Sequence, residues 1–311
     1  MAFTNILLIG ATGNLGSLIL KHLIASPADY KVTVLTRESS SSAATTKDAF
    51  PSSVTVRKIS SDYPDAELVE AFRGQDVVIG AISMTGMHLQ YRIIDAAVAA
   101  GVKRYFPTEF GLDELPDWLV ELRPMFRIKH DVRDYLVTKE KEGLQWTCIV
   151  CNVFFEMGIM SGFFNFHWGV GEGGKKNKAV LVDGGDVKWV ATTLETVAVA
   201  VVRSIERADK TKNKLLLIQD FRTSQRELLD RIQLKTGADA WTVEDVKYDE
   251  WLEEAKETVR GGDNSALGRL TFGTVLLGSN WEERAEYGNT LLDLPTRSFE
   301  DAIQSVLKDV S

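Results

Sequence analysis

Short apolar runs rich in valine and isoleucine alternate with segments of helical period over the first 150 residues. This alternation is typical of β-α-β units, so we expect an α/β fold built on a doubly wound parallel sheet. The predicted strands cover Asn5 to Ile9, Val32 to Leu35, Val54 to Ile59, Asp76 to Ile82, Arg104 to Phe106 and Trp146 to Val150. The predicted helices cover about Leu15 to Ser26, Ala66 to Phe72, Gln90 to Ala100 and Phe126 to Lys139.

The pattern changes after residue 155. An aromatic segment, Phe163 to Trp168, leads into a Gly/Lys loop, Gly171 to Lys178. A helix over Glu195 to Arg203 and a strand over Lys214 to Ile218 resemble further layers of the same sheet. The remainder is predicted to be mostly helical, with Trp241, Trp251 and Trp281 spread along it. We therefore expect a core over 1–155, with 188–220 adding to its sheet, and a smaller, mostly helical substrate-binding lobe from 156–187 and 221–311.

Composition limits the partners. The 311 residues carry a net charge of -8, with 44% apolar and 26% charged positions. An acidic surface disfavours phosphate backbones and anionic membranes, so neither nucleic acid nor a membrane is expected as a partner. The sequence has no apolar run of about 20 residues and no signal-peptide pattern at its start. We expect a cytoplasmic protein, a monomer or a homodimer, that acts on a small molecule; the Ser/Thr-rich stretch 39–46 is predicted to be a surface loop.

The cysteines and histidines predict no metal or redox centre. Cys148 and Cys151 are three residues apart in a predicted strand, which separates them by about 10 Å. A disulfide needs Cα atoms within about 7 Å, so two small buried side chains are favoured over a redox pair. The four histidines have no spacing typical of metal ligands.

A glycine-rich loop between the first strand and the first helix carries the clearest chemical signal. Backbone N–H groups at the start of a helix suit a pyrophosphate, and glycine permits the close approach. In this context the G-x-x-G-x-x-G spacing favours a dinucleotide site of the Rossmann type over a simple turn. Its residues are Gly10, Ala11, Thr12, Gly13, Asn14, Leu15 and Gly16.

The end of the second predicted strand indicates which dinucleotide binds. Arg37 stands where an acidic residue would bind the ribose hydroxyls of NAD, and Glu38 follows one position later. An arginine there pairs with the 2'-phosphate of NADP, a preference of roughly tenfold to hundredfold. Ser39 is expected to add a hydroxyl donor to the same phosphate. A solvated surface role for Arg37 is the alternative.

Several segments together resemble the NmrA-like, isoflavone-reductase-like branch of atypical short-chain dehydrogenases. The most specific is Ala100 to Gly111, which contains the K-R-[YF]-x-P-[ST]-E-F-G core, and the others are Gly10 to Gly16, Gln90 to Ala97, Lys129 to Arg133 and Tyr287 to Pro295. The resemblance implies an NADPH-dependent reductase with its substrate between the Rossmann core and the lobe. It places Lys129 at the nicotinamide ribose and the reacting oxygen. It places the nicotinamide pocket at Ala81, Ile82, Ser83, Asn152, Val153 and Phe154.

The residues around Lys129 give an independent interpretation. Met125 stands four positions before it, so the Tyr-x-x-x-Lys pair of ordinary short-chain dehydrogenases is missing. Reduction of a carbonyl or enone builds negative charge on oxygen, which an ammonium group can stabilise or protonate. His130 is one helical step away and cannot face the same point. Glu109, in the middle motif, is interpreted as a structural hydrogen-bond partner.

Aromatic side chains after the sixth strand are candidates for a substrate pocket. They could equally form the core between the lobes. The stripe comprises Phe154, Phe155, Met157, Phe163, Phe164, Phe166 and Trp168. Of these, Met157, Phe163, Phe164 and Trp168, together with Met84 and Phe110, are the substrate candidates.

The leading hypothesis is an NADPH-dependent reductase that transfers hydride to a C=C, C=O or C=N bond of a small conjugated or aromatic secondary metabolite, with Lys129 as proton donor or oxyanion stabiliser. Two alternatives keep the cofactor. One is a redox sensor that binds NADP without catalysis, and the other is an isomerase or cyclase that performs no net redox step.

Overall fold

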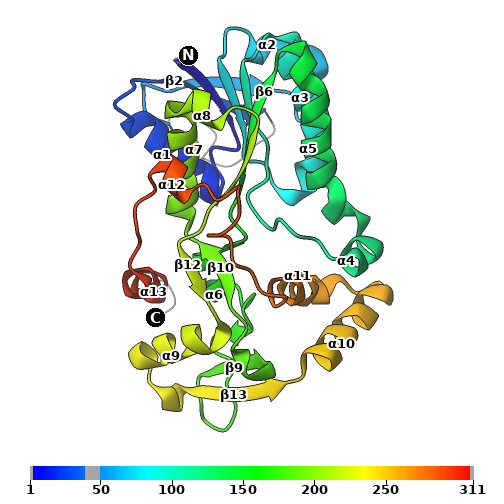
Figure 1. Cartoon of the computed structure of the whole chain (residues 1–311), viewed down its shortest axis with the longest axis vertical. Helices are drawn as coiled ribbons and strands as arrows, with labels where there is room; N and C mark the ends of the chain where they lie inside the picture. Colours follow the sequence, from blue (N-terminus) through cyan, green and yellow to red (C-terminus); the bar gives the residue numbers. More distant parts are fainter. Residues whose placement is uncertain (1–2, 39–49, 309–311) are drawn as a thin grey trace.

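The computed structural model describes residues 3–38 and 50–308, and its main element is a seven-stranded sheet (Figure 1). Every neighbouring pair is parallel, in the order β11-β6-β5-β4-β1-β2-β3. Since the order reverses at β1, the loop after β1 lies at the switch point where such sheets bind ligands. The strands are β1 (Asn5–Ile9), β2 (Lys31–Arg37), β3 (Thr55–Ile59), β4 (Val77–Gly80), β5 (Arg104–Phe106), β6 (Gln145–Val150) and β11 (Lys214–Leu217).

Helices cover both faces of this sheet, which confirms the doubly wound fold. One face packs against α1 and α7, and the other packs against α2, α3 and α5. The short apolar strands have no polar face because both faces are covered. The helices are α1 (Asn14–Ala25), α2 (Asp65–Phe72), α3 (Gln90–Ala99), α5 (Ile128–Lys139), α7 (Leu194–Glu206) and the single turn α8 (Ala208–Thr211).

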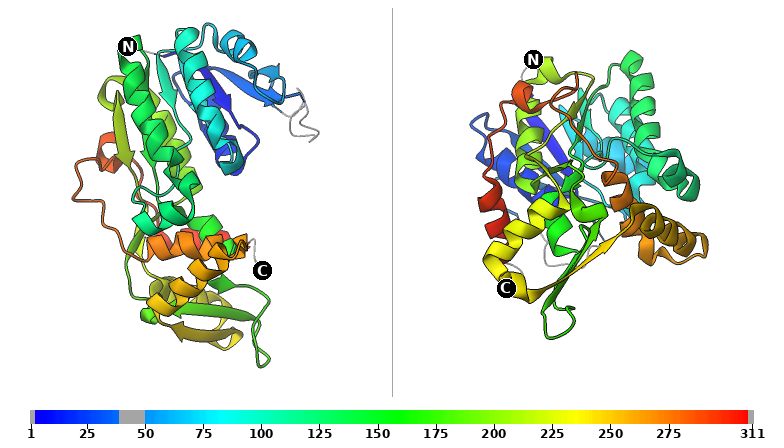
Figure 2. Two further views of the ribbon diagram at one scale, coloured as in Figure 1. Left: turned by 90° about the vertical axis from the view of Figure 1, so that its right-hand side faces the viewer. Right: turned by 60° about the horizontal axis from the view of Figure 1, so that its bottom comes forward.

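A smaller lobe lies at one end of the sheet (Figure 2). Two three-stranded sheets, β12-β10-β7 and β13-β9-β8, form its interior together with helices. Its strands are β7 (Val153–Phe154), β8 (Phe166–His167), β9 (Asn177–Val182), β10 (Trp189–Thr192), β12 (Phe221–Thr223) and β13 (Trp241–Val246). Its helices are α4 (Asp117–Leu122), α6 (Phe155–Met160), α9 (Gln225–Thr236), α10 (Tyr248–Arg260), α11 (Leu267–Val275) and α13 (Phe299–Lys308).

The chain between α11 and α13 runs from the lobe to the core and back (Figure 1). The N–H of Leu217 in β11 donates to Glu286 O at 2.9 Å, and the N–H of Gly288 donates to Leu217 O at 2.8 Å. The short helix α12 (Asn289–Leu292) then contacts α7. This return segment therefore ties the lobe to the edge of the large sheet.

Two predictions about the second half are wrong in part. Only Lys214–Leu217 from the segment 188–220 extends the large sheet, whereas Trp189–Thr192 pairs with β7 and β12. Asn152, whose φ is 55°, lies between β6 and β7, and its side-chain amide donates to Val190 O at 2.8 Å, which holds β10 beside β7. Trp241, expected in a helical region, begins the strand β13.

Candidate functional site

The glycine loop forms a tight cradle at the carboxyl end of β1. A Cβ on Gly10 would lie 2.1 Å from the backbone oxygen of Ala81, and one on Gly16 would lie 2.0 Å from Gly10 O. These two glycines permit close packing of the loop, the helix and β4. Gly13 differs, because the nearest atom to its Cβ would be Gly10 O at 3.4 Å. A side chain there would project into the cleft, so Gly13 keeps space for a ligand.

The first turn of α1 begins directly after Gly13, which lines the same cleft. Gly13 is the N-cap residue and provides no side-chain cap, which leaves the first amides for a bound anion. Asn14 and Leu15 stand in this first turn. The buried Gly16, predicted to bind cofactor, acts through packing.

The cleft in front of the loop has a volume of about 600 Å³. Arg37 ends β2 and lines this cleft, and it forms no ion pair within residues 3–38 and 50–308. Burial raises the pKa of Tyr63, an effect that the nearby positive charge of Arg37 partly offsets. The guanidinium is thus placed for an anionic group. Ser39 lies outside the described residues. The predicted residues that line the cleft are Gly10, Ala11, Thr12, Gly13, Arg37, Ala81, Ile82 and Ser83.

Sequence reasoning missed a second wall of this cleft. Ser61, Asp62 and Tyr63 follow β3, and Arg92 lies on α3. The position of Ser61 to Tyr63 directly after β3 could have indicated this wall, since the carboxyl ends of neighbouring parallel strands meet at one edge of the sheet. Thr85, Gly86, His88 and Leu89, from the turn after β4, complete the lining.

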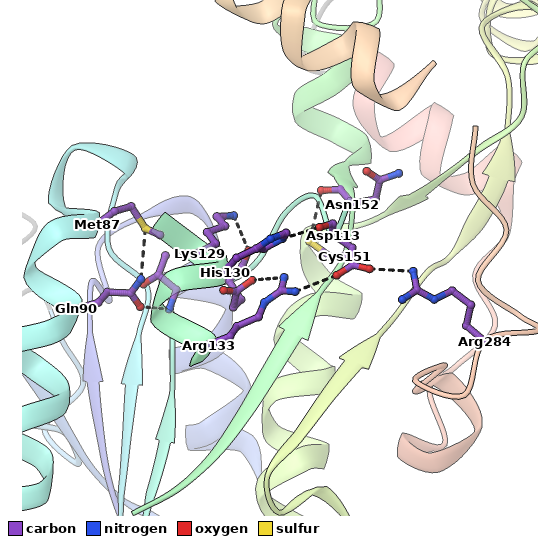
Figure 3. Close-up of polar contacts among 11 residues, drawn as sticks. Met87, Gln90, Asp113, Lys129, His130, Arg133, Cys151, Asn152 and Arg284 are labelled. Atoms are coloured by element: carbon purple, nitrogen blue, oxygen red, sulfur yellow. Dashed lines mark hydrogen bonds and ion pairs between the residues drawn. The ribbon is translucent and has the colours of Figure 1, made fainter. Parts of the chain in front are cut away.

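The loop after β5 holds the turn after β4 in place. The buried Gln90 accepts a hydrogen bond from the N–H of Thr108 at 2.7 Å. The hydroxyl of Thr108 in turn accepts from the N–H of Ile82 at 3.2 Å. Gln90 also donates to the sulfur of Met87 at 3.7 Å (Figure 3). Thr108 therefore holds the backbone of Ile82, and Gln90 fixes both Thr108 and Met87.

A second, apolar pocket of about 440 Å³ adjoins this cleft. Ser83 lines the cleft and the next residue, Met84, lines the pocket. Met84, Met125 and Met157 are 41%, 49% and 40% exposed, so flexible thioethers form part of the wall. The predicted residues that line the pocket are Met84, Phe110, Lys129, Asn152, Val153, Phe154, Met157 and Phe163.

Two predicted substrate residues belong to the core of the lobe instead. Phe164 has no exposed surface, and it packs against Trp189 and Phe272 with ring centroids 5.6 and 5.7 Å apart. Trp168 packs edge-on against Trp241 at 5.0 Å and does not line the pocket. The interpretation of both as substrate contacts is wrong, because the packing of the lobe turns them away from the cavity. Phe155 and Phe166, from the same stripe, are also fully buried.

Lys129 reaches the wall of the apolar pocket from the first turn of α5. Its ammonium donates to the backbone oxygen of Glu109 at 2.5 Å. Loss of water around the ammonium lowers the pKa of Lys129, and the nearby charge of Glu109 opposes this shift. His130 faces another direction, as expected, and contacts Asp113 O at 2.8 Å. The pocket thus contains a partly desolvated cation among apolar groups.

The carboxylate of Glu109 lies next to this lysine and is fully buried. Its Oε2 accepts from Arg133 Nη2 at 2.7 Å, which agrees with the structural role expected for Glu109. Arg133 also donates to Asp113 at 3.0 Å. Burial lowers the pKa of Arg133, but the two carboxylates together raise it by more, so the guanidinium stays charged.

Neither cysteine is suited to redox chemistry. Cys148 and Cys151 are both free and fully buried. Burial raises the pKa of Cys151 to about 12, so it is a thiol rather than a reactive thiolate. In the described part of the chain, no group of three or more His, Cys, Asp or Glu side chains is arranged to hold a metal ion. No helix within 3–38 and 50–308 is long and apolar enough to cross a bilayer.

Comparison with known proteins identifies relatives along the chain. The model of the NmrA-like family matches residues 3–246. The oxidoreductase aprR of Aspergillus flavus is 34% identical over 310 residues, which cover 97% of this chain and 98% of the relative. The isoflavone reductase homolog IRL of Zea mays is 32% identical, with 75% of each protein covered.

Solved structures share the fold at lower identity. The structure of AtPrR2 with NADP+ and (+)pinoresinol has a TM-score of 0.75 at 19% identity and covers 98% of this chain and 99% of its own. The complex of leucoanthocyanidin reductase with NADPH from Vitis vinifera also has a TM-score of 0.75, at 20% identity, with 98% and 99% covered. The Rossmann core and the lobe are therefore found together in both solved structures.

Proposed function

This chain belongs to the NmrA-like family, and on that premise we propose that it is an NADPH-dependent reductase of a small conjugated or aromatic metabolite. The relatives named as oxidoreductase and isoflavone reductase homolog support the reaction class. The observation that carries the proposal is the place of Lys129. Its ammonium lies in the wall of an apolar pocket that adjoins the glycine cleft at the junction of Ser83 and Met84.

The residues of the cleft fit NADP(H). Gly13 leaves room for a pyrophosphate, and the first turn of α1 offers N–H donors to it. Arg37 is placed for the 2'-phosphate at the end of β2. The neighbouring structures that bind NADP+ or NADPH support this assignment. When bound, the nicotinamide supplies the hydride.

The apolar pocket selects the substrate. Phe110, Phe126, Phe154 and Phe163 line it, and aromatic rings and methionines favour a flat apolar molecule. The proposed substrate carries a reducible C=C, C=O or C=N bond in conjugation. The pinoresinol in a neighbouring structure is an aromatic compound, which supports the aromatic character of the proposed substrate but not the type of bond reduced.

Lys129 performs the acid step in this proposal. As the electrophilic carbon is reduced, electrons accumulate on the conjugated heteroatom, and the ammonium stabilises that charge or transfers its proton to it. Desolvation lowers the pKa of the lysine and so makes the proton easier to release. Apolar neighbours such as Phe110 and Met157 keep water from competing for the same heteroatom.

The experiment follows the absorbance of NADPH with a panel of conjugated aromatic ketones, imines and enones. We expect one class to be reduced by the parent protein, and Lys129→Met to lower kcat by about 10²- to 10⁴-fold with NADPH binding retained. Lys141→Met, at an exposed lysine beyond the end of α5, is the matched control and should keep the parent rate.

Two results would contradict the proposal. Turnover of Lys129→Met at the parent rate would remove Lys129 from the chemistry. Tight NADPH binding without consumption by any compound of the panel would favour a redox sensor over a reductase.

A further inference from the structure

Four charged side chains of alternating sign, Glu109, Arg133, Asp113 and Arg284, form a line behind Lys129. Figure 3 labels Arg133, Asp113 and Arg284 of this line. Glu109 pairs with Arg133 at 2.7 Å, and Arg133 pairs with Asp113 at 3.0 Å. The other oxygen of Asp113 accepts from Arg284 Nη1 at 2.8 Å. Arg133 therefore has a carboxylate on each terminal nitrogen, and Asp113 has an arginine on each oxygen.

The inner part of this line is buried. Glu109 is fully buried, Asp113 is 9% exposed, and the side chain of Arg133 is 16% exposed. Glu109 Oε1 and Arg133 Nε have no hydrogen-bond partner among the described residues, so the line is not fully satisfied. A buried ion pair of this kind is often no more stable than apolar residues of the same size. The arrangement of these charged side chains is therefore better explained by the neighbouring group that they hold in place than by a gain in stability.

Lys129 is the group next to the inner end. Arg133 binds the carboxylate of Glu109, and the backbone oxygen of Glu109 accepts a hydrogen bond from the ammonium of Lys129 at 2.5 Å. A shift of the Glu109 backbone moves both groups together. The ammonium also lies directly against Gly111, because a methyl group on Gly111 would lie 2.6 Å from Nζ.

The outer end of the line comes from a distant part of the sequence. Arg284 lies on the return segment that β11 anchors through the hydrogen bonds of Glu286 and Gly288 to Leu217. It also lies beyond residues 3–246, the part matched by the family model. The return segment therefore contacts both the edge of the large sheet and the charged line behind the pocket.

We propose that Arg284 and Asp113 are positioning residues for Lys129, which act by fixing Arg133 and, through it, Glu109. The inference rests on the proposed role of Lys129 in reduction. Arg284 orients Asp113, and Asp113 keeps Arg133 from turning away from Glu109. The backbone oxygen of Glu109 then holds the ammonium toward the substrate.

The test compares Arg284→Met, Arg284→Lys and Asp113→Asn with the parent protein. The reporters are kcat and KM for NADPH with the best compound of the panel. We expect Arg284→Met and Asp113→Asn to lower kcat about tenfold with KM for NADPH unchanged, because a small displacement of an acid group costs rate rather than cofactor binding. Arg284→Lys keeps the cation and should recover most of the rate.

A second measurement does not need a substrate. Competitive acetylation with acetic anhydride, read by mass spectrometry as a function of pH, reports the reactivity of Lys129 alone. The charged and titratable groups around it are Glu109, Arg133 and Cys151. We expect Arg284→Met to increase acetylation of Lys129 about threefold at a fixed pH, because the neutral amine, which is the form that reacts, is more accessible when the side chain is held less firmly.

Arg231→Met is the matched control. Arg231 forms an ion pair with Glu300 at 2.7 Å, far from the pocket lining. It should change neither kcat nor the acetylation of Lys129. Melting temperatures of all variants are measured alongside.

The outcomes separate the two proposals. If Lys129→Met is as active as the parent, the proposed function fails whatever Arg284 does. If Lys129→Met is inactive while Arg284→Met has the parent rate and the parent acetylation of Lys129, this inference alone is overturned. A loss of rate that follows a lower melting temperature and that Arg284→Lys does not restore would show a structural role, and would also overturn it.

Discussion

A methyl group placed on Gly111 would lie 2.6 Å from Nζ of Lys129. The backbone of Gly111 does not adopt a left-handed conformation, so the glycine is required for space around the ammonium. We predict that Gly111→Ala displaces the ammonium and lowers kcat by about 10- to 100-fold, since misplacement of a reacting group by about 1 Å costs this much.

Steady-state kinetics and the melting temperature check this prediction together. Gly268→Ala, at a helical position with no atom within 4 Å of the added methyl, should keep both rate and stability. Parent kinetics in Gly111→Ala would mean that the ammonium tolerates displacement and that its observed place is not required.

Arg37 should decide between the two nicotinamide cofactors. It lines the cleft at the end of β2 and pairs with no carboxylate in the described ranges. We predict that Arg37→Ala weakens NADPH binding by about 10- to 100-fold, the value of one charge-assisted hydrogen bond, and leaves NADH nearly unchanged. Fluorescence titration with both cofactors measures this, with Arg73→Ala as an exposed control outside the cleft lining. Equal losses for both cofactors would contradict the 2'-phosphate assignment.

Substitutions of two glycines in the loop should affect cofactor binding and folding stability separately. A methyl at position 13 meets only Gly10 O at 3.4 Å, while one at position 16 would lie 2.0 Å from that oxygen. We predict that Gly13→Ala keeps its melting temperature but loses NADPH affinity by about tenfold or more. Gly16→Ala should lose about 1–3 kcal/mol of unfolding free energy, because backbone must move. Calorimetry and cofactor titration distinguish the two; a stable, tightly binding Gly16→Ala would show that the loop can open without cost.

The fold was predictable where the sequence pattern is local. The strands around residues 5–9 and 104–106 and the glycine loop follow from apolar runs, their length and their flanking residues, all of which lie within one β-α unit. The position of Arg37 follows from the same unit, because the register pairs Leu35 with Ile9 at the end of β1.

Features set by tertiary packing were not predictable in this way. Phe163 and Phe164 are adjacent and chemically identical, yet Phe163 lines the pocket and Phe164 is buried against Gly158. The packing of Phe164 against Trp189 and Gly158 distinguishes them. Likewise, Asp113 and Arg284 are 171 residues apart, and no period connects them.

The two phenylalanines give a prediction about stability. Phe164→Ala removes a fully buried ring that contacts Trp189 and Phe272, and should lower the unfolding free energy by about 3–5 kcal/mol. Met157→Ala removes a side chain that is 40% exposed in the pocket wall, and should cost about 0.5 kcal/mol or less while it raises KM for an aromatic substrate. Urea unfolding and kinetics measure both. Similar losses of stability in the two variants would refute the division between pocket and core.

The pKa of Lys129 is lowered in the folded protein, and we therefore predict that the protein is more stable when the charge of this lysine is removed. Desolvation lowers the pKa of Lys129 below the ordinary value of 10.5 that it regains on unfolding. Between these two pKa values the unfolded chain binds more protons, so this lysine adds stability as pH rises through that window. Below the window the ammonium is charged in both states, and its burial opposes folding.

Lys129→Met keeps most of the aliphatic chain and removes the charge. We therefore expect it to be inactive yet to melt at a higher temperature than the parent at neutral pH, and we expect the difference to shrink as pH rises toward 10.5. Melting curves of both proteins over this range measure the difference, in which the titrating groups that do not interact with Lys129 cancel. A variant that melts lower than the parent at neutral pH, by an amount independent of pH, would mean that the contacts of the ammonium with Glu109 outweigh its desolvation. The lysine would then be a stabilising group rather than one held in the pocket at the expense of stability.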